Sequence, residues 1–385
     1  ATGFIDWSSQ PSSFKHYPDF LFRYAFGSVE ELHQVELARM VSSRVQIASK
    51  PYLKLTPPSA GNLHPVELYV QIRGVKGVLS GIYHVDAQRG EIVLVGEIQK
   101  DGLESYVGLS GTLFGMLFVI SVVPFRAQWK YKERAMRYCY LDAGHQVGAL
   151  ATSLKLYGQK MTILSGFEKQ SLHDAMGFKN EEFVVAVAYS GELKEKSVSQ
   201  LKQNLMYVAP TDYSELDTSL LKSLQKNELL KSQELVIRAE VTEQSIVKRR
   251  SARSFDVQES MSQENLKVFL EYMRDIEYPL SCYGVVLSNA GVKAGIYHKG
   301  NCIKEGSFAK EICSLLVNQK FIQNADIVYV LASKYFSANT LMHAALFTHE
   351  LYMHAEAKGI GCSGIGAFYD KKLQEFLGID EYILY

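Results

Sequence analysis

AGHQVGALATSLKLYGQKMTILSGF at residues 143–167 and AALFTHELYMHAEAKGIGCSGIGAF at residues 344–368 have the same layout. Each begins with an Ala-rich stretch whose apolar residues predict an amphipathic helix ending at a glycine, Gly158 or Gly359. A short polar loop follows and ends in Gly-Phe or Gly-Ala-Phe, at the same distance from that glycine in both stretches. This agreement indicates that the chain contains an internal duplication.

Two flanking matches support the duplication. RGVKGVLSGIYH at residues 73–84 resembles NAGVKAGIYH at residues 289–298, and each follows a β-rich run. Downstream, QSLHDAMGF and KKLQEFLGI each predict a second short helix. We therefore predict two homologous halves, residues 1–195 and 245–385. Between them, residues 196–244 are rich in Lys, Gln, Ser and Glu and predict a helical connector.

The first half contains short runs that are typical of strands. ELYVQI, IYHV, EIVLVG, LFVISVV and FVVAVAYSG are rich in Val, Ile and Tyr, and they alternate with helical patterns. The longest apolar stretch, Gly111–Phe125, is too short to span a bilayer and predicts a helix end running into a buried strand. Together these patterns predict a layered α+β fold.

The overall composition excludes several classes of protein. The 385 residues are 47% hydrophobic and carry no formal net charge, which argues against disorder and against a nucleic-acid or membrane partner. The five cysteines form no C-x-x-C pair, so we expect buried thiols and neither disulfides nor a metal site. The opening ATGFIDW resembles no signal peptide, and we expect a cytoplasmic protein.

Three segments carry residues suited to chemistry. KRRSARSF at residues 248–255 concentrates three arginines, whose planar guanidinium groups suit a phosphate dianion; the alternative is an exposed basic turn. PPSAGNLHP at residues 57–65 has small residues that let the backbone approach a flat ligand; the alternative is an ordinary Pro-Gly loop. In residues 125–145, Lys130 and Tyr131 are predicted at the start of a helix, where they could transfer a proton; the alternative is a solvated helix face.

Five motifs together resemble the nitroreductase superfamily, and within it the tandem members of the SagB/ThcOx-type dehydrogenases. The motifs lie in the family's order and are found at Phe4–Tyr17, Pro58–Tyr69, Trp129–His145, Lys248–Phe255 and Ser363–Asp370. The resemblance implies a nitroreductase-like fold in which the two halves form an intrachain pseudo-dimer. It also implies FMN as cofactor, held between an arginine motif and glycine loop from one half and a Pro-Ser loop from the other.

The resemblance identifies the candidate site residues. The expected FMN-binding residues are Pro58, Ser59, Ala60, Gly61, Asn62, Arg249, Arg250, Ser251, Arg253, Gly364, Ile365, Gly366, Ala367 and Phe368. Lys130 and Tyr131 match the catalytic Lys-Tyr pair of this group. The first half has no Arg-Arg-Ser-x-Arg motif and the second has no Pro-Ser-x-Gly-Asn loop, so we expect one FMN per chain.

The expected activity is hydride transfer from a small-molecule or peptide substrate to flavin N5, with an azoline-like group as the implied substrate class. Two alternatives stay open at this stage: a NAD(P)H-dependent reductase of nitro, quinone or enone compounds, and a non-catalytic pseudo-dimeric binding partner. The sequence also leaves open whether two pseudo-dimers associate.

Overall fold

The structure is a computed structural model. It describes residues 54–75, 77–87, 90–179, 181–206, 230, 233–274, 276, 279–287 and 291–385, and also the strands β1 (Ser28–Val29), β2 (Val35–Val41) and β3 (Arg44–Lys50). The predicted motif at Phe4–Tyr17 lies outside these residues. Most of the predicted helical connector also lies outside them; among its described residues, Gln233–Leu235 form a strand.

The first half is built on a seven-stranded antiparallel sheet with the order β11-β9-β10-β8-β5-β6-β7. All five strands predicted from Val, Ile and Tyr content are present. The strands are β5 (Val66–Arg73), β6 (Gly81–Asp86), β7 (Glu91–Glu97), β8 (Thr112–Val122), β9 (Met161–Leu164), β10 (Phe183–Lys194) and β11 (Gln233–Leu235). The prediction of a helix end within Gly111–Phe125 was wrong, because β8 is buried on both faces and reads as one continuous apolar run.

The second half repeats this topology. Its five-stranded sheet has the order β14-β13-β12-β15-β16, which corresponds strand for strand to β7-β6-β5-β8-β10. The strands are β12 (Ser281–Val286), β13 (Gly295–His298), β14 (Asn301–Glu305), β15 (Ile327–Ser333) and β16 (Tyr382–Ile383). The duplicated order agrees with the repeat in the sequence.

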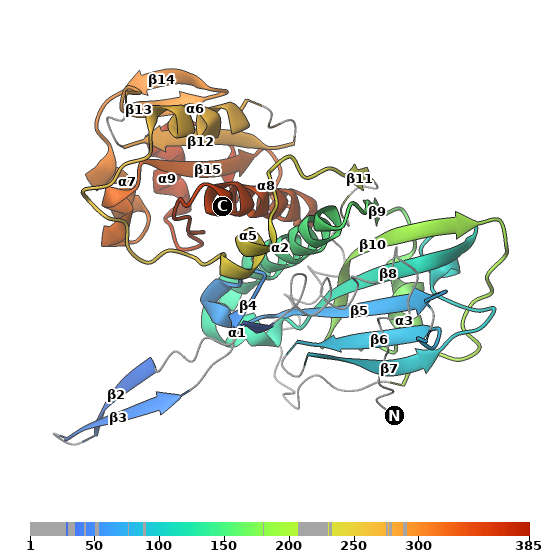
Figure 1. The fold of residues 1–385 in the computed structure, drawn as a ribbon. Coiled ribbons are helices and arrows are strands. Elements are labelled where there is room, and N and C mark those ends of the chain that lie inside the picture. The colour runs from blue at the N-terminus through green and yellow to red at the C-terminus, as the bar shows by residue number, and fades with distance from the viewer. Residues whose placement is uncertain are drawn as a thin grey trace.

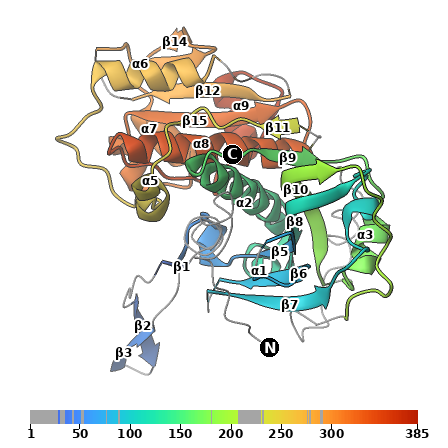
Figure 2. The same ribbon diagram turned by 45° about the vertical axis from the view of Figure 1, so that its right-hand side comes forward.

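Two long helices lie side by side between the two sheets, α2 (Ala135–Leu156) and α8 (Ala338–Ala357) (Figures 1 and 2). Each is followed by a glycine with positive φ, +67° at Gly158 and +68° at Gly359, as the sequence predicts. They are not amphipathic, however, because nearly every residue is buried against a sheet or the other helix. A Cβ at Gly144 would lie 2.6 Å from the Ala345 Cβ, so glycine permits this close packing.

The remaining elements connect and cover the sheets. They are β4 (Lys54–Leu55), η3 (Ala60–Asn62), η4 (Glu104–Tyr106), α1 (Phe125–Tyr131), η5 (Lys132–Arg134), α3 (Lys169–Ala175), α5 (Glu243–Lys248), α6 (Gln263–Tyr272), α7 (Ala309–Leu315), η6 (Lys320–Asn324) and α9 (Asp370–Leu377). Helices α3 and α9 are the second short helices predicted after the repeated stretches.

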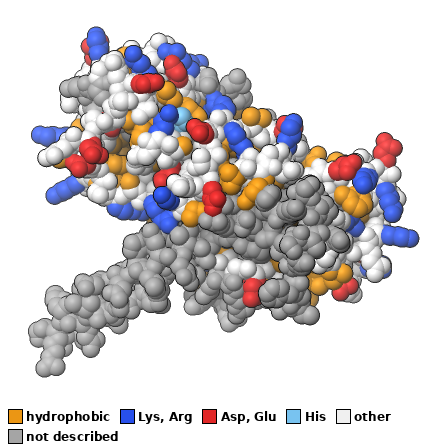
Figure 3. All heavy atoms as spheres, viewed as in Figure 1, with side chains coloured by type: hydrophobic (Ala, Val, Ile, Leu, Met, Phe, Trp, Pro, Cys, Tyr) orange, Lys and Arg blue, Asp and Glu red, His pale blue; other side chains and the backbone are white. Residues whose placement is uncertain are grey.

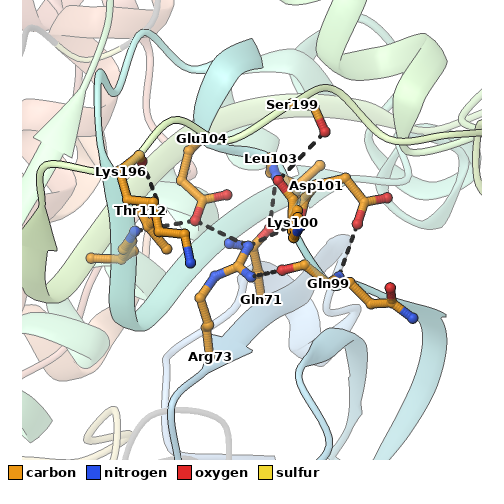
Figure 4. Close-up of polar contacts among 11 residues, drawn as sticks. Gln71, Arg73, Gln99, Lys100, Asp101, Leu103, Glu104, Thr112, Lys196 and Ser199 are labelled. Atoms are coloured by element: carbon orange, nitrogen blue, oxygen red, sulfur yellow. Dashed lines mark hydrogen bonds and ion pairs between the residues drawn. The ribbon is translucent and has the colours of Figure 1, made fainter.

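A buried ion pair ties the loop before β8 to the first sheet (Figure 4). The Arg73 guanidinium lies 3.3 Å from Glu104 Oε1 and also donates to the carbonyls of Gln99 and Asp101. The Gln71 side chain accepts a hydrogen bond from the Leu103 N–H at 2.7 Å. Burying these charges is tolerated because each is paired and hydrogen-bonded.

The surface and the cysteines agree only partly with the sequence predictions. On the face shown in Figure 3, acidic and basic side chains are interspersed over the described residues, as expected for a chain with no net charge. Among the described residues, no helix is long and apolar enough to cross a membrane.

All five cysteines are free thiols, but the prediction that all are buried was wrong for exposed Cys302 and half-buried Cys362.

Candidate functional site

The Pro-Ser loop is held in place by a buried carboxylate on α2. Ser59 Oγ donates to Asp142 Oδ2 at 2.6 Å, and the Ala60 N–H donates to Asp142 Oδ1 at 3.1 Å. Ser59 Oγ also accepts from the His64 N–H at 2.9 Å, so this serine organises the loop from inside. The loop then presents Gly61 and Asn62 to solvent in left-handed conformations, with φ of 62° and 57°.

The Lys-Tyr pair lies directly against this loop. A Cβ at Gly61 would collide with the Tyr131 hydroxyl and lie 2.8 Å from Lys130 Nζ, so only glycine fits here. The pair lies at the end of a helix, and the prediction that it lies at a helix start was wrong. Lys132 adopts a φ of 49°, which ends α1 and separates it from α2.

Tyr131 links the Pro-Ser loop to the glycine loop of the other half. Its ring lies 4.4 Å, centroid to centroid, from the ring of Tyr138 on α2. The Tyr138 hydroxyl donates to the Gly366 carbonyl at 2.9 Å, and a Cβ at Gly366 would collide with the Tyr138 ring. Burial raises the pKa of Tyr131 above its ordinary value.

Two arginines at the start of α2 clamp the glycine loop. Arg134 and Arg137 contact the carboxylate of Asp370 at 2.8 and 2.7 Å. Their guanidinium groups also lie 4.5 and 5.0 Å from the ring centre of buried Phe368. The loop is therefore positioned by the first half of the chain, although it belongs to the second.

The clamped loop leaves main-chain donors available. Gly364 donates its N–H to the Tyr352 hydroxyl. For Ile365, Gly366 and Ala367, no acceptor for the N–H lies among the described residues. Ala367 is exposed, and the two residues before it are half-buried. These N–H groups are the kind of donor that binds a polar ligand edge.

The arginine motif reaches the Pro-Ser segment through Arg249. This side chain is only 4% exposed, and its Nε donates to the Thr56 carbonyl at 3.0 Å, two residues before Pro58. Its Nη1 is buried and has no hydrogen-bond partner among the described residues. The sequence prediction that these two segments meet agrees with this contact.

The other members of the arginine motif are used differently. Arg250 donates to the carbonyls of Val247 and Arg249, and Ser251 Oγ lies 2.9 Å from the Tyr352 hydroxyl. Arg253 is exposed and close enough to Tyr131 for its charge to oppose the rise in the pKa of that hydroxyl.

A cavity of about 400 Å³ lies next to these segments, but inside the second half. It is lined by the glycine-loop residues Gly364, Ile365 and Phe368, whereas neither the Pro-Ser loop nor the Lys-Tyr pair contributes to it. The structure therefore joins the Pro-Ser loop, the Lys-Tyr pair and the glycine loop through Tyr131 and Tyr138, whereas the hydrogen bonds given above for Arg250 and Ser251 stay within the second half.

Sequence reasoning missed three residues that organise the site: Asp142, Tyr138 and Asp370. All three lie within the motifs quoted above, but their letters alone do not show that they bridge separate segments. Asp142 is the only acidic residue in Ala135–Leu156, between apolar Leu141 and Ala143, and this was the available signal, because buried acids usually have a partner.

The fold and the site together define a class of protein. Two α+β halves with the same strand order surround a pair of central helices, and motifs from both halves meet at their junction. A family model described as the nitroreductase family matches residues 35–191 and 298–385, more than half of the chain. The chain belongs to the nitroreductase family, and this membership supports an oxidoreductase role.

Individual relatives agree with this assignment. A protein of Methanocaldococcus jannaschii named as a nitroreductase, MJ1384, is 32% identical over 108 residues, which cover 26% of this chain and 54% of the relative. The trifolitoxin-processing protein TfxB of Rhizobium leguminosarum biovar trifolii is 28% identical over 107 residues, 26% of this chain and 28% of the relative. The chain thus matches about half of the first relative and about a quarter of the second. The likeness to TfxB supports the narrower resemblance to SagB-type members.

A solved structure shows the same fold over the whole chain. A protein from Anabaena variabilis described as a nitroreductase superposes with a TM-score of 0.72 at 20% identity, covering 99% of this chain and 94% of that protein. The prediction of a nitroreductase-like α+β fold is confirmed.

Proposed function

We propose that the chain is an FMN-dependent oxidoreductase of the SagB/ThcOx type, with one site formed between its two halves. The observation that carries the proposal is the series of contacts from Gly61 through Tyr131 and Tyr138 to Gly366. It joins the loops that the family resemblance assigns to opposite sides of one flavin. In this proposal residues 1–195 and 245–385 act as the two members of an intrachain pseudo-dimer.

The residues present fit an FMN. Arg249 has a buried Nη1 with no hydrogen-bond partner in the part of the chain that the structure describes, and exposed Arg253 belongs to the same motif, so we propose that the two share a phosphate dianion. The N–H groups of Gly366 and Ala367 are available to the polar edge of a flavin ring. The Pro-Ser loop, fixed by Asp142, offers the exposed backbone of Gly61 and Asn62 for close contact.

The proposal of one FMN per chain is supported by the sequence, since the first half has no Arg-Arg-Ser-x-Arg motif and the second half has no Pro-Ser-x-Gly-Asn loop. In the first half, ILSGF contributes Ile163 and Leu164 to β9, whose main chain pairs with β10 and β11. Ser165 and Gly166, the counterparts of Gly366 and Ala367, follow directly after this strand. The corresponding loop of the second half has no such strand.

The chemistry divides between cofactor and protein. Bound FMN supplies a hydride acceptor at N5. The Tyr131 hydroxyl, which is protonated at neutral pH, donates a hydrogen bond that orients the substrate. Lys130 Nζ, exposed on α1 beside Gly61, takes up the proton that leaves the substrate carbon when the side chain is an uncharged amine. We propose a small-molecule or peptide substrate with an azoline-like ring, because the Lys-Tyr pair matches the group that oxidises such rings.

An absorbance spectrum of the purified protein tests the proposal directly. We expect flavin bands, or their appearance on reconstitution with FMN, at one FMN per chain. A colourless protein that does not bind added FMN would contradict the proposal and favour a non-catalytic binding partner.

The likeness to a protein named as a nitroreductase favours a second candidate, a NAD(P)H-dependent reductase at the same site. Rapid anaerobic mixing of the FMN-loaded protein with NADPH separates the two functions. Fast bleaching of the flavin bands supports the reductase. Bleaching by an azoline-containing substrate, and not by NADPH, supports the dehydrogenase.

Lys130→Ala is expected to keep FMN bound while turnover falls about 100-fold or more, because the variant lacks the proton acceptor and retains the loop contacts. Flavin titration measures the first quantity and substrate oxidation the second. Lys196→Ala, at an exposed lysine beyond the end of β10, is the matched control and should change neither. Loss of FMN in Lys130→Ala would show that Lys130 has a structural role instead.

A further inference from the structure

Each sheet has a matching polar cluster on the face that α3 or α9 covers. A cluster consists of a tyrosine, a histidine opposite it on the next strand and a glutamate that accepts from the tyrosine hydroxyl: Tyr69, His84 and Glu182 in the first half, and Tyr283, His298 and Glu381 in the second. The tyrosine and histidine rings lie 5.0 and 4.6 Å apart, centroid to centroid. Because both halves contain it, the cluster belongs to the repeated fold and does not distinguish the half that carries the Pro-Ser loop.

The first half adds an ion pair to its cluster. Glu67 and Ser281 are counterparts, because each lies two residues before the tyrosine of its cluster. Glu67 Oε2 lies 2.7 Å from His84 Nε2, and its Oε1 lies 2.5 Å from Arg126 Nη2. Ser281 carries no charge and cannot form such a pair. The ion pair therefore occurs in the half that also carries the Pro-Ser loop.

Arg126 connects this ion pair to the end of the Pro-Ser loop. Its Nη1 donates to the His64 carbonyl at 3.1 Å, while its Nη2 contacts Glu67, so one guanidinium group joins the loop to β5. Arg126 is also the second residue of α1, and Lys130, four residues further on, lies on the same side of this helix. Lys130 reaches the loop beside Gly61. The helix that carries the Lys-Tyr pair thus contacts the loop at two points.

His64 has a main-chain conformation that must be held. Its φ is 45°, in the left-handed region that non-glycine residues rarely adopt, and the next residue, Pro65, restricts it further. Such a conformation persists only where the surroundings fix it. Both main-chain groups of His64 are fixed here: the N–H donates to Ser59 Oγ at 2.9 Å, and the carbonyl accepts from Arg126. The loop therefore has two anchors, Asp142 behind Ser59 and the ion pair behind His64.

The conformation of His64 also affects a residue of the proposed flavin site. His64 Nε2 lies 3.0 Å from Asn62 Oδ1, and because an amide oxygen only accepts, the ring N–H donates. Asn62 is one of the expected FMN-binding residues, and it too has a left-handed conformation, with a φ of 57°. A His64 that leaves its left-handed conformation no longer orients Asn62.

We propose that Glu67 and Arg126 are positioning residues for the flavin, which fix the end of the Pro-Ser loop so that Gly61 and Asn62 face the ring. The inference rests on the proposed function, because it concerns the loop that this function assigns to the flavin. Neither Glu67 nor Arg126 touches the cofactor; each acts through His64. The Arg126 side chain is 33% exposed, so water solvates it in part and the pair contributes little to the stability of the whole fold. Its loss should therefore affect the loop more than the fold.

Hydrogen–deuterium exchange of the flavin-free chain tests whether the ion pair holds the loop. Arg126→Met removes the donor to the His64 carbonyl, and Glu67→Ser introduces the residue that the second half has at this position. Each variant should speed exchange in the peptide covering residues 59–64 about tenfold, because the hydrogen bond of the His64 N–H opens more often. Exchange within β8, in the middle of the sheet, should not change. A parental exchange rate in either variant would overturn the role of the substituted residue.

Flavin titration tests whether the held loop matters to the cofactor. Both variants should bind FMN about tenfold more weakly at an unchanged urea midpoint, because FMN must then fix a loop that the parent already holds. The circular dichroism of the bound flavin should change too, since it reports the contacts around the ring. Arg126→Lys should not restore affinity, because one ammonium group lacks the planar fork that bridges Glu67 and His64. Glu192→Gln, at a glutamate of β10 that pairs with Lys194, is the matched control and should change neither affinity nor midpoint.

The outcomes separate this proposal from the proposed function. Parental FMN affinity in variants whose loop exchanges faster would overturn the positioning role and leave the function intact. A lower urea midpoint in both variants, with parental exchange in the loop, would assign the ion pair to the sheet instead. A parent chain that binds no FMN would refute the proposed function, and the positioning role with it.

Discussion

Asp142→Ala is expected to abolish measurable FMN binding and to lower the free energy of unfolding by about 3 kcal/mol. The variant leaves the Ser59 hydroxyl and the Ala60 N–H without their buried acceptor, and both hold the Pro-Ser loop in its left-handed turn. Without this anchor the loop no longer faces Tyr131 in a fixed position. Urea unfolding measures the stability, and flavin fluorescence quenching measures the affinity.

Asp142→Asn is the matched control, because the amide retains an acceptor for Ala60 and a group of the same shape. Burial raises the pKa of Asp142 to about 7, above its ordinary value near 4 in an unfolded chain. A carboxyl whose pKa is raised by folding stabilises the protein below the unfolded pKa, and that stabilisation is lost as pH rises through about 7. The fall in stability between pH 5 and pH 8 should therefore be smaller in Asp142→Asn than in the parent. Equal slopes, together with full FMN affinity in Asp142→Ala, would show that this carboxyl does not hold the loop.

The strands and the duplication could be predicted from the sequence because they depend on local pattern. Runs such as ELYVQI and FVVAVAYSG carry enough Val, Ile and Tyr to specify strands, and each lies inside a strand of the structure. The repeated glycines after the two long helices fix the helix ends through a backbone conformation that glycine prefers. The amphipathic character predicted for α2 failed because a helix between two sheets has no solvent face.

The site was predictable as a set of segments and not as a set of contacts. The sequence indicated that the arginine motif and the Pro-Ser loop meet, and Arg249 does contact Thr56. It did not indicate that Arg250 and Ser251 are bound to groups of their own half. The sequence analysis also missed that a helix ends at Tyr131. The positive φ of Lys132 ends this helix, and the spacing of hydrophobic residues does not indicate such a backbone conformation. Tertiary contacts determine which atoms remain available to a ligand, and the residues that make these contacts are far apart in the sequence.

Arg249→Met is expected to lower the affinity for FMN about 100-fold and to leave the flavin-free protein at least as stable as the parent. Arg249 is a buried cation, and burial is the main cause that lowers its pKa. Among the described residues, its contacts are a hydrogen bond to Thr56 and the face of the Tyr352 ring, 5.1 Å from the guanidinium carbon. Neither is a negative charge, so the cost of taking the cation out of water is poorly offset, and an apolar chain of similar length removes that cost.

This combination separates a ligand-binding role from a structural one. If Arg249 serves mainly to join the halves, Arg249→Met loses stability and any loss of FMN affinity follows from unfolding. If it serves a phosphate, affinity falls while the urea midpoint of the flavin-free protein is unchanged or higher. Lys248→Met, at the exposed neighbouring position, controls for the loss of one positive charge and should change neither quantity. A lower midpoint with unaltered FMN affinity in Arg249→Met would contradict the phosphate role, because only a residue needed by the ligand justifies an unpaired cation in this position.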